Sequence, residues 1–481
     1  MFDLSHFLGW FSLLFLVSAI PVAIMVVFEK RSPYKTIAWI LALILLPVLG
    51  VLFYLIFGQE YRKRKMFSVR GLKGLKELRR ISAQQLRDID HKPLIGDAKA
   101  HDNIIRLLLK NSNALLTSGN QLEILKDGQQ TFQAIFEAIE KAQHHIHLEY
   151  YILVNDSIGK KLFDLLRKKR AEGVEVRIIV DDVGSWSLKT KFYNQLREQG
   201  IEIFPFMEVR FPRLTSRVNY RNHRKIIVID GKTGFVGGLN ITDRYLNGSK
   251  RLGPWRDTHL KISGDAATSL QIIFLADWYF VSGNNLGGQT YLPKFSEADG
   301  TPVQIVAGGP DYDWEGIAQG FFAAITNARK RVYIATPYLI PPPALLLALK
   351  TAALSHVDVR IIIPEKSDSK ISKWGSFSYV EELLEAGVKV YFYTAGFTHS
   401  KYMLIDDTFS TIGTTNFDFR SFETNFEANA FIYSKDFNAK LEALFKEDQR
   451  NSRHIKLSPW RKRGWPLKLR ESLAHIFSPM M

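Results

Sequence analysis

The feature that most constrains this chain of 481 residues is a repeat within it. Residues 223–230 read His-x-Lys-x4-Asp, and residues 399–406 read the same. After six further residues, each copy continues with Gly-x-x-Asn, at 237–240 and at 413–416. A single copy would be weak evidence, but two copies with identical spacing indicate two halves of one site.

The repeat extends beyond the motif to whole structural units. Two Val-acid-Val-Arg-Ile-Ile stretches begin at Val174 and Val357, and the offset between them nearly equals the offset between His223 and His399. Alternating helical and strand-like apolar patterns predict a central sheet covered by helices. We therefore expect an α/β fold with two tandem units, residues 121–300 and 301–450, forming a pseudo-twofold pair with a shared cleft.

Apolar spacing places individual elements in each unit. In the first unit the pattern predicts helices at 132–142 and 159–172 and strands at 145–154 and 174–180. In the second unit it predicts helices at 316–329 and 344–354 and strands at 332–339 and 357–363. Two segments are interpreted as loops and short helices that wall the cleft, residues 184–221 and 364–376.

The N-terminal part of the chain differs in character from the rest. Residues 7–28 and 36–57 are apolar runs without a charge, each close to the roughly 20 residues that cross a bilayer core as a helix. A cleaved signal peptide is the alternative for the first run, but residues 1–6 lack Lys and Arg and the run is long for such a signal. We expect a retained two-helix transmembrane hairpin over residues 1–60.

Positive charge follows this hairpin. The chain has a formal net charge of +16, and the segment from Arg62 to Arg80 holds nine Lys or Arg residues against one Glu. We expect residues 61–120 to be a basic juxtamembrane and helical connector. Segments rich in Lys and Arg tend to remain on the cytoplasmic side of a membrane, so we expect the two tandem units on that side. The same basic segment could also bind anionic lipid headgroups.

The last segment, residues 451–481, is again basic and carries Trp460 and Trp465. A solvated basic tail is one interpretation. Tryptophan among basic residues favours the other, an interfacial segment lying on a membrane.

The motif residues suit phosphate-ester chemistry. Side chains alternate along a strand, so His223 and Lys225 share one face, as do His399 and Lys401. One imidazole can attack phosphorus to give a phosphohistidine, while the other protonates the leaving alkoxide and then deprotonates the incoming alcohol or water. Four side chains are expected to donate to the non-bridging oxygens, so that neither a metal ion nor another cofactor is expected: Lys225, Asn240, Lys401 and Asn416.

A nucleophilic histidine needs an acceptor that fixes its second ring nitrogen. Asp257 follows His223, and Glu427 follows His399, at similar separations along the chain. We expect each carboxylate to orient the histidine of its own half.

The remaining polar candidates are given structural interpretations. Asp230 and Asp406 complete the motifs and belong to the candidate catalytic set, but each ends a strand and is expected to anchor a loop. His145, His147 and Glu149 share one face of a strand and could together ligate a metal ion. The matching stretch of the second unit has no histidine, so ordinary strand positions are favoured and no metal site is expected.

These residues resemble the phospholipase D superfamily, whose signature is the doubled His-x-Lys-x4-Asp with Gly-x-x-Asn. The resemblance extends over nearly the whole chain towards the bacterial cardiolipin synthases. It is carried by the N-terminal helix pair and by residues 31–33, 38–39, 54–58, 148–151, 219–225, 418–422 and 425–427.

The resemblance implies a fold of two tandem phospholipase D-like units and a reaction. A phosphatidyl group passes from one phosphatidylglycerol to the terminal hydroxyl of another, and glycerol is released. It also implies that His223 is the nucleophile and that His399 acts as acid and base. The implied partners are phosphatidylglycerol and other anionic phospholipids in the bacterial inner membrane, which the chain crosses more than once. Nucleic acid is not expected, and the sequence carries no signal of an oligomeric state.

Two other functions stay open. A membrane-bound hydrolase or nuclease of the same superfamily would use water in place of the lipid alcohol. A catalytically idle lipid-binding protein is the third, and the two intact motifs argue against it. Membrane tethering favours lipid over nucleic acid as the substrate.

Overall fold

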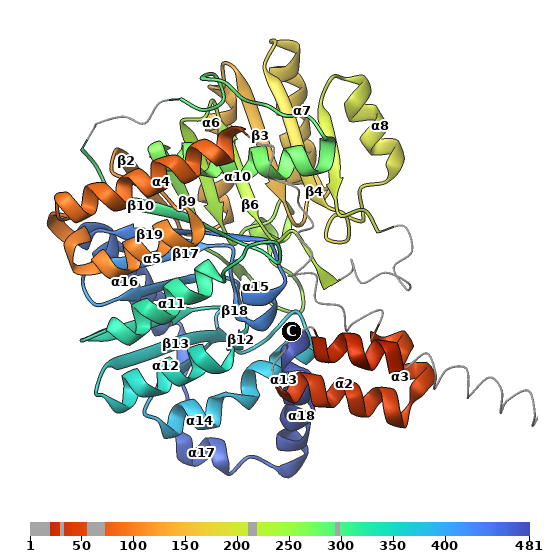
Figure 1. The fold of residues 1–481 in the computed structure, drawn as a ribbon, viewed down its shortest axis with the longest axis vertical. Helices are drawn as coiled ribbons and strands as arrows, with labels where there is room; N and C mark the ends of the chain where they lie inside the picture. The colour runs from red at the N-terminus through yellow and green to blue at the C-terminus, as the bar shows by residue number, and fades with distance from the viewer. Residues whose placement is uncertain (1–19, 29–32, 55–72, 210–218, 294–298) are drawn as a thin grey trace, which may run out of the picture. The chain divides into compact units, whose positions relative to one another are not determined.

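The computed structural model (Figure 1) describes residues 20–28, 33–54, 73–209, 219–293 and 299–481. Contacts along the chain group the residues into two compact units. One unit holds residues 1–67 and 207–220, and the other holds residues 68–206 and 221–481. The larger unit contains both copies of the repeat.

The first repeat forms a seven-stranded sheet with the order β2-β9-β7-β6-β3-β4-β5. Strands β3, β4 and β5 are parallel, and the others pair in antiparallel fashion. The strand bounds in chain order are β2 Asn120–Leu125, β3 His145–Tyr150, β4 Glu175–Asp181, β5 Glu202–Phe206, β6 Lys225–Ile229, β7 Thr233–Gly237 and β9 His259–Gly264.

The second repeat forms a nine-stranded sheet with the order β1-β10-β19-β17-β16-β11-β13-β14-β20. Its run from β10 to β14 repeats the order of the first sheet strand for strand. The bounds are β1 Leu116–Thr117, β10 Val303–Gly308, β11 Arg331–Ala335, β13 Asp358–Pro364, β14 Lys389–Tyr393, β16 Tyr402–Ile405, β17 Phe409–Gly413, β19 Glu427–Tyr433 and β20 Ser452–His454. The expected pair of α/β units is confirmed.

Helices cover the outer face of each sheet (Figure 1). On the first sheet they are α6 Gly128–Glu140, α7 Ser157–Ala171 and α8 Thr190–Glu198, packed in one apolar cluster with the strands. On the second sheet they are α5 Asp102–Ser112, α11 Gly316–Asn327, α12 Pro343–Leu354, α13 Lys370–Ser378 and α14 Val380–Glu385. Apart from β2 and β20 at the sheet edges, most of the strands are buried on both faces, which explains their nearly continuous apolar sequences.

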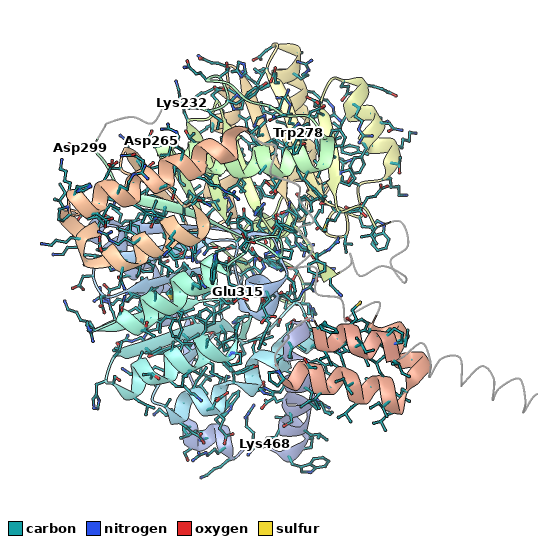
Figure 2. All side chains as sticks on the ribbon, viewed as in Figure 1. Lys232, Asp265, Trp278, Asp299, Glu315 and Lys468 are labelled. Atoms are coloured by element: carbon teal, nitrogen blue, oxygen red, sulfur yellow. The ribbon has the colours of Figure 1, made fainter. Side chains whose placement is uncertain are left out.

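The two sheets pack face to face through a third apolar cluster. Ile226 and Leu260 of the first sheet meet Leu404 and Ile412 of the second within it. Helices α10 Asp265–Ser282 and α16 Lys435–Arg450 also contribute to this cluster. Trp278, labelled in Figure 2, belongs to α10. It is fully buried, and its ring lies edge-on to the ring of Phe204 in β5, with 5.2 Å between ring centres. The outer helices therefore enclose the two sheets, with α10 and α16 between the sheets, and the sheets contact each other directly through β7 and β17.

Several segments contain more regular structure than the sequence patterns indicated. The stretch interpreted as loops and short helices at 184–221 includes the helix α8 and also the strand β5, which was not predicted. The expected connector contains α4 Lys73–His91, η4 Gly96–His101, α5 and β1, of which α5 and β1 belong to the second sheet's side of the molecule. Short elements complete the larger unit: β8 Trp255–Arg256, α9 Arg244–Asn247, β12 Leu339–Ile340, β15 Phe397–Thr398, β18 Phe417–Asp418, α15 Phe419–Glu423, α17 Leu457–Arg461, α18 Trp465–Ile476 and η6 Ser478–Met480.

In the N-terminal unit, the second expected span is not one continuous helix. It is divided into α2 Pro33–Leu45 and α3 Pro47–Phe53. The rings of Trp39 and Tyr54 lie 5.4 Å apart, whereas a straight helix between these positions would separate them by about 22 Å. The chain thus doubles back at Leu46–Pro47, because proline has no N–H to donate and its ring clashes with the preceding turn.

The first expected span, 7–28, lies mostly outside the described residues, which hold a helical stretch at 20–28. Residues 55–57 of the second span also lie outside them. Within the part of the chain that is described, no helix has both the length and the apolar character needed to cross a membrane.

Candidate active site

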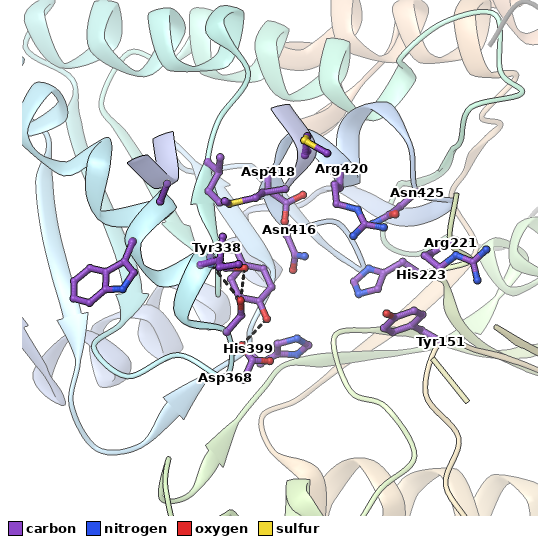
Figure 3. A pocket seen from close by; sticks show the side chains of 18 of the residues that line it. Tyr151, Arg221, His223, Tyr338, Asp368, His399, Asn416, Asp418, Arg420 and Asn425 are labelled. Atoms are coloured by element: carbon purple, nitrogen blue, oxygen red, sulfur yellow. Dashed lines mark hydrogen bonds between the residues drawn. The ribbon is translucent and has the colours of Figure 1, made fainter. Parts of the chain in front are cut away.

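Both motif histidines open into one cavity of about 870 Å³ (Figure 3). His223 comes two residues before β6, and His399 comes three residues before β16, at the same end of the packed sheets. Both side chains are largely buried. Asn240 and Asn416 of the Gly-x-x-Asn segments line the same cavity, so the structure brings the predicted halves of the site together.

The two orienting carboxylates are exchanged between the halves. His223 Nδ1 lies 2.8 Å from Glu427 Oε1, and His399 Nδ1 lies 2.8 Å from Asp257 Oδ2. The prediction that each carboxylate orients the histidine of its own half is therefore wrong, although both carboxylates were identified. Each histidine is held by a group from the other repeat.

Backbone pairing between the halves explains this exchange. Strand β15, just before His399, pairs in parallel with β8, just before Asp257, and the His399 N–H donates to the carbonyl of Arg256 at 2.7 Å. On the other side, the His223 N–H donates to the carbonyl of Phe426 at 2.9 Å. Each histidine is thus fixed beside the chain segment that carries the opposite carboxylate.

The second residue of the Gly-x-x-Asn segment lies beside the carboxylate in both repeats, but it is glycine in the first and threonine in the second. A Cβ atom at Gly238 would overlap the carboxylate of Asp257, so only glycine fits beside it. At the equivalent position, the Thr414 hydroxyl donates a hydrogen bond to Glu427. Burial raises the pKa of Glu427 to about 7, opposed by the charge of Lys225 and by the Thr414 hydrogen bond. The two dyads are therefore chemically unequal.

The motif lysines are buried against their own histidines. Lys225 Nζ donates to the carbonyl of His223 at 2.7 Å, and Lys401 Nζ donates to the carbonyl of His399 at 2.6 Å. Burial lowers the pKa of Lys225 to about 7 and that of Lys401 to about 8. An anion entering the cavity would restore the charged form of both groups.

Burial also favours neutral imidazoles. The pKa of His223 is held well below its ordinary value by desolvation and then by Lys225 and Lys401, and burial lowers the pKa of His399 in the same way. A neutral ring that donates its Nδ1–H to a carboxylate leaves the lone pair of Nε2 available. At His399, Lys401 Nζ lies 3.2 Å from this nitrogen. His223 is thus prepared to act as a nucleophile, and His399 has a cation beside the nitrogen that would exchange a proton with the substrate.

The two motif asparagines differ in how their amide groups are held. A Cβ at Gly237 would lie 2.6 Å from the Cα of His259, so this motif glycine lets β7 approach β9 closely. Asn240 Oδ1 accepts a hydrogen bond from the Ile152 N–H at 3.0 Å, which fixes its amide. Asn416 Oδ1 is buried without a hydrogen-bond partner among the described residues.

The motif aspartates do not line the cavity. Asp230 accepts hydrogen bonds from the backbone N–H groups of residues 143, 144 and 145 at 2.8–2.9 Å. Asp406 does the same with residues 329, 330 and 331 at 2.7–3.0 Å. Both have left-handed backbones, with φ of 53° and 48°. They anchor the loop that leads into β3 or β11, so their contacts support the expected structural role and not a catalytic one.

The strand histidines of the first unit are engaged elsewhere. His147 lies 2.8 Å from Gln271 Nε2 and stacks on Phe274, with 4.3 Å between ring centres. Glu149 accepts a hydrogen bond of 2.6 Å from Asn222, the residue before His223. In the described part of the chain, no three His, Cys, Asp or Glu side chains are grouped so that they could hold a metal ion.

Most of the residues that line the cavity were not predicted as site residues from the sequence, and four of them belong to the polar part of the cavity. Tyr151 lies edge-on to His223 with 5.0 Å between ring centres, and the Tyr245 hydroxyl lies 3.3 Å from His399 Nδ1. Arg244 and Arg420 also line the cavity. A signal for the arginines was present, because each follows the motif asparagine of its repeat by four residues.

One wall of the cavity is apolar and comes from α13 and the C-terminal segment. The lining residues there are Ile371, Trp374, Leu473, Phe477, Met480 and Met481. Leu473 and Phe477 are 51% and 54% exposed. The carbonyl of Met481 accepts a hydrogen bond from the Arg420 N–H at 2.8 Å, which ties the chain end to the catalytic side. The cavity therefore has a charged inner end and an apolar outer wall.

Comparison with known sequences gives family matches over most of the chain. Residues 135–254 and 321–449 match the family described as "Cardiolipin synthase, PLD-like domain". Residues 9–59 match the family described as "Phospholipase_D-nuclease N-terminal". The first match covers both repeats, including each histidine motif.

Whole-length relatives agree with these matches. The chain is 44% identical over 476 residues to the cardiolipin synthase of Geobacillus sp. (strain WCH70), covering 98% of this chain and 94% of the relative. It is 39% identical to the major cardiolipin synthase ClsA of Bacillus subtilis (strain 168), covering 97% and 98%. A phosphatidylserine synthase from Haemophilus influenzae Rd KW20 has a similar fold, with a TM-score of 0.60 at 15% identity over 79% of this chain and all of that structure.

Proposed function

This chain belongs to the bacterial cardiolipin synthases of the phospholipase D superfamily, and we propose that it joins two phosphatidylglycerol molecules into cardiolipin and releases glycerol. The observation that carries the proposal is the crossed pair of histidine–carboxylate contacts at the charged end of a partly apolar cavity. Two imidazoles with separate roles are what a double-displacement transfer requires.

In the first step, His223 Nε2 attacks the phosphorus of the donor lipid. A nitrogen–phosphorus bond forms and the bond from phosphorus to the headgroup glycerol oxygen breaks. This step requires the protonated form of His399, whose pKa is lowered by burial and by Lys401 and raised by Asp257. His399 then gives its proton to that oxygen, and free glycerol leaves. The phosphatidyl group remains on His223.

In the second step, neutral His399 takes the proton from the terminal hydroxyl of a second phosphatidylglycerol. That oxygen attacks phosphorus, the bond to His223 breaks, and cardiolipin is formed with both histidines restored. Charge on the non-bridging oxygens in both transition states is met by Lys225 and Lys401, which lie beside the histidines, with Asn240 and Asn416 as further donors.

The apolar wall supports a lipid substrate over nucleic acid. Acyl chains leaving the charged end of the cavity would run along α13 and α18, where large apolar side chains are half exposed beside the cavity. We place the lipid tails there. We further propose that residues 1–60 form a membrane anchor, that the basic connector and the segment 451–481 contact the inner-membrane surface, and that the two repeats lie on the cytoplasmic side.

The test is to supply the purified full-length chain with phosphatidylglycerol as its only lipid and to identify the products. Cardiolipin together with glycerol supports the transferase. Phosphatidic acid together with glycerol, without cardiolipin, would show a hydrolase and would contradict the proposal.

A second test addresses the apolar wall. Leu473→Ser and Phe477→Ser remove side chains that line the cavity, whereas Ile476→Ser removes one that is 69% exposed on the same helix but does not line it. The first two should lose most activity on long-chain lipid and keep it on a short-chain, water-soluble phosphatidylglycerol. Equal losses in all three variants would mean that the helix binds the membrane without guiding the lipid tails.

A further inference from the structure

Two arginines occupy equivalent places in the repeat but differ in their surroundings. Arg244 follows Asn240 by four residues, and Arg420 follows Asn416 by four. Both line the catalytic cavity. Because the two repeats pack around one site, these arginines reach it from opposite halves, and their separate neighbours define a separate role for each.

Arg420 lies on the side of His223. Figure 3 shows its side chain directed towards the same part of the cavity as the His223 ring. Its positive charge is among those that lower the pKa of His223, and its backbone N–H holds the chain end at Met481. This is the side on which the phosphatidyl group would be bound to the nucleophile.

Arg244 lies on the side of His399. The carbon of its guanidinium is 5.2 Å from the centre of a Trp255 ring, and that tryptophan is 5.9 Å from the His399 ring. The next residue, Tyr245, has its hydroxyl 3.3 Å from His399 Nδ1. A chain of ring contacts therefore connects Arg244 to the histidine that would activate the acceptor hydroxyl.

The guanidinium of Arg244 has no hydrogen bond or ion pair with any described residue. It is only partly exposed, so it is not simply a solvated surface charge. Arginine presents five N–H donors in a rigid plane that matches phosphate oxygens in pairs. A free guanidinium facing a cavity that binds phosphodiesters is thus a ready site for a further phosphate.

The proposed reaction supplies such a phosphate. The acceptor phosphatidylglycerol carries its own phosphodiester, one glycerol unit from the hydroxyl that attacks. With that hydroxyl against His399, the non-reacting phosphate falls on the side of the cavity where Arg244 lies. We propose that Arg244 binds the phosphate of the acceptor lipid and thereby selects a phospholipid alcohol over water or free glycerol. This inference rests on the proposed function.

The contact affects the second step and not the first. The donor reacts at His223, and phosphohistidine formation does not involve the acceptor phosphate. Water has no phosphate and gains nothing from Arg244, so loss of this side chain should shift the partition of the phosphohistidine from lipid transfer to hydrolysis. A charge-assisted contact of this kind is worth about tenfold to a hundredfold in apparent affinity.

The experiment compares Arg244→Gln, Arg244→Lys and Lys250→Gln in the full-length chain. Lys250 is exposed, lies six residues further along and does not line the cavity, so it controls for loss of a positive charge. Phosphoenzyme formation is measured in a single turnover with a nitrophenyl phosphodiester of phosphatidic acid. The ratio of cardiolipin to phosphatidic acid is then measured in mixed micelles of phosphatidylglycerol.

We expect Arg244→Gln to form the phosphoenzyme within about twofold of the native rate, to raise the apparent KM for the acceptor by about tenfold or more and to release more phosphatidic acid. Arg244→Lys should recover part of the acceptor affinity, and Lys250→Gln should match the native chain. An unchanged product ratio and KM in Arg244→Gln would overturn the inference, as would an equal loss of phosphoenzyme formation. If the native chain itself makes phosphatidic acid and no cardiolipin, the proposed function fails instead.

Discussion

His223 Nδ1 lies 2.8 Å from the carboxylate of Glu427, which comes 204 residues later in the chain. The equivalent contact of the other repeat joins His399 Nδ1 to Asp257, 142 residues earlier in the chain, at the same distance. Neither repeat therefore contains a complete histidine–carboxylate dyad. The catalytic roles of the two histidines should be separable through the carboxylates of the opposite repeats.

Exchanging the carboxylates for amides tests this crossed arrangement. Glu427→Gln should impair the nucleophile, lowering phosphoenzyme formation by about 10²- to 10⁴-fold even with an activated donor, because an amide does not select the Nδ1–H tautomer. Asp257→Asn should spare phosphoenzyme formation with that donor and impair turnover on the natural lipid. Stopped-flow release of nitrophenol measures the first quantity. The reverse pattern would assign each carboxylate to the histidine of its own half.

The histidines themselves can be separated in the same way. His223→Ala should form no phosphoenzyme with any donor, whereas His399→Ala should lose about 10³-fold or more on natural lipid. A nitrophenyl phosphodiester leaves without a proton, so His399→Ala should still form an adduct with it. Mass spectrometry should locate that adduct on His223. An adduct on His399 in the His223→Ala chain would exchange the two roles.

The lysines predict a pH dependence. Lys225 and Lys401 have pKa values of about 7 and about 8, so the free enzyme loses their positive charge as the pH rises through this range. Since the charged form binds phosphate, kcat/KM should fall on the alkaline side. An arginine at position 225 stays charged at all these pH values, so in Lys225→Arg the decrease of kcat/KM should move towards the pKa of Lys401. The absolute rate of this variant should be lower than that of the native chain.

The measurement is kcat/KM for a soluble phosphodiester from about pH 6 to about pH 9. Lys401→Arg is the matched control, which should leave a fall governed by Lys225 at lower pH. A native kcat/KM that stays constant or rises across this range would show that the free lysines are not the groups that bind phosphate.

The motif aspartates should act on stability and not on chemistry. Asp230→Ala leaves three backbone N–H groups without their acceptor and places alanine in a left-handed backbone, so unfolding should become easier by about 1–3 kcal/mol. Asp230→Asn keeps one acceptor oxygen, and asparagine tolerates a left-handed backbone, so this variant should lose less of the free energy of unfolding. Thermal unfolding measures both. Native stability with lost turnover in Asp230→Ala would return this residue to the catalytic set.

Turnover should also withstand a chelator. In the proposed mechanism two lysines and two asparagines meet the charge of the phosphate, so charge neutralisation does not depend on a metal cation. Activity measured on a non-ionic micelle, where chelation leaves the surface unchanged, should equal that of untreated enzyme. Activity that is lost and then restored by zinc or magnesium would contradict this expectation and redirect attention to His145 and His147.

The sequence was sufficient for the repeat, for the strands that carry it and for the histidines, asparagines and orienting carboxylates of the site, because a doubled motif with fixed spacing rarely arises without duplication of a whole unit. The sequence was insufficient to predict which carboxylate contacts which histidine. Asp257 and Glu427 follow their motifs at similar separations, and in a pseudo-twofold pair either histidine could meet either carboxylate. Two parallel contacts between remote segments determine which one is close: β8 with β15 beside His399, and Asn222 with Phe426 beside His223.

Two other differences have local causes. Residues 36–57 were predicted to form one transmembrane helix because the run is long and apolar. Pro47 lies within the run, however, where one helix ends and the next begins. In the C-terminal segment, Trp460 was expected at an interface but is 6% exposed, with the Arg463 guanidinium 3.2 Å from the centre of its ring. Trp465, 74% exposed, retains the character that the sequence indicated.

The exchange of carboxylates also has a consequence for biosynthesis. A nascent chain that has emerged only through the first repeat carries His223 without the group that orients it, since Glu427 belongs to β19 and is translated 204 residues later. In the proposed mechanism, His223 would therefore be a poor nucleophile until the second repeat has been made and has docked on the first. Truncated or proteolysed chains that stop short of residue 427 would lack the same carboxylate.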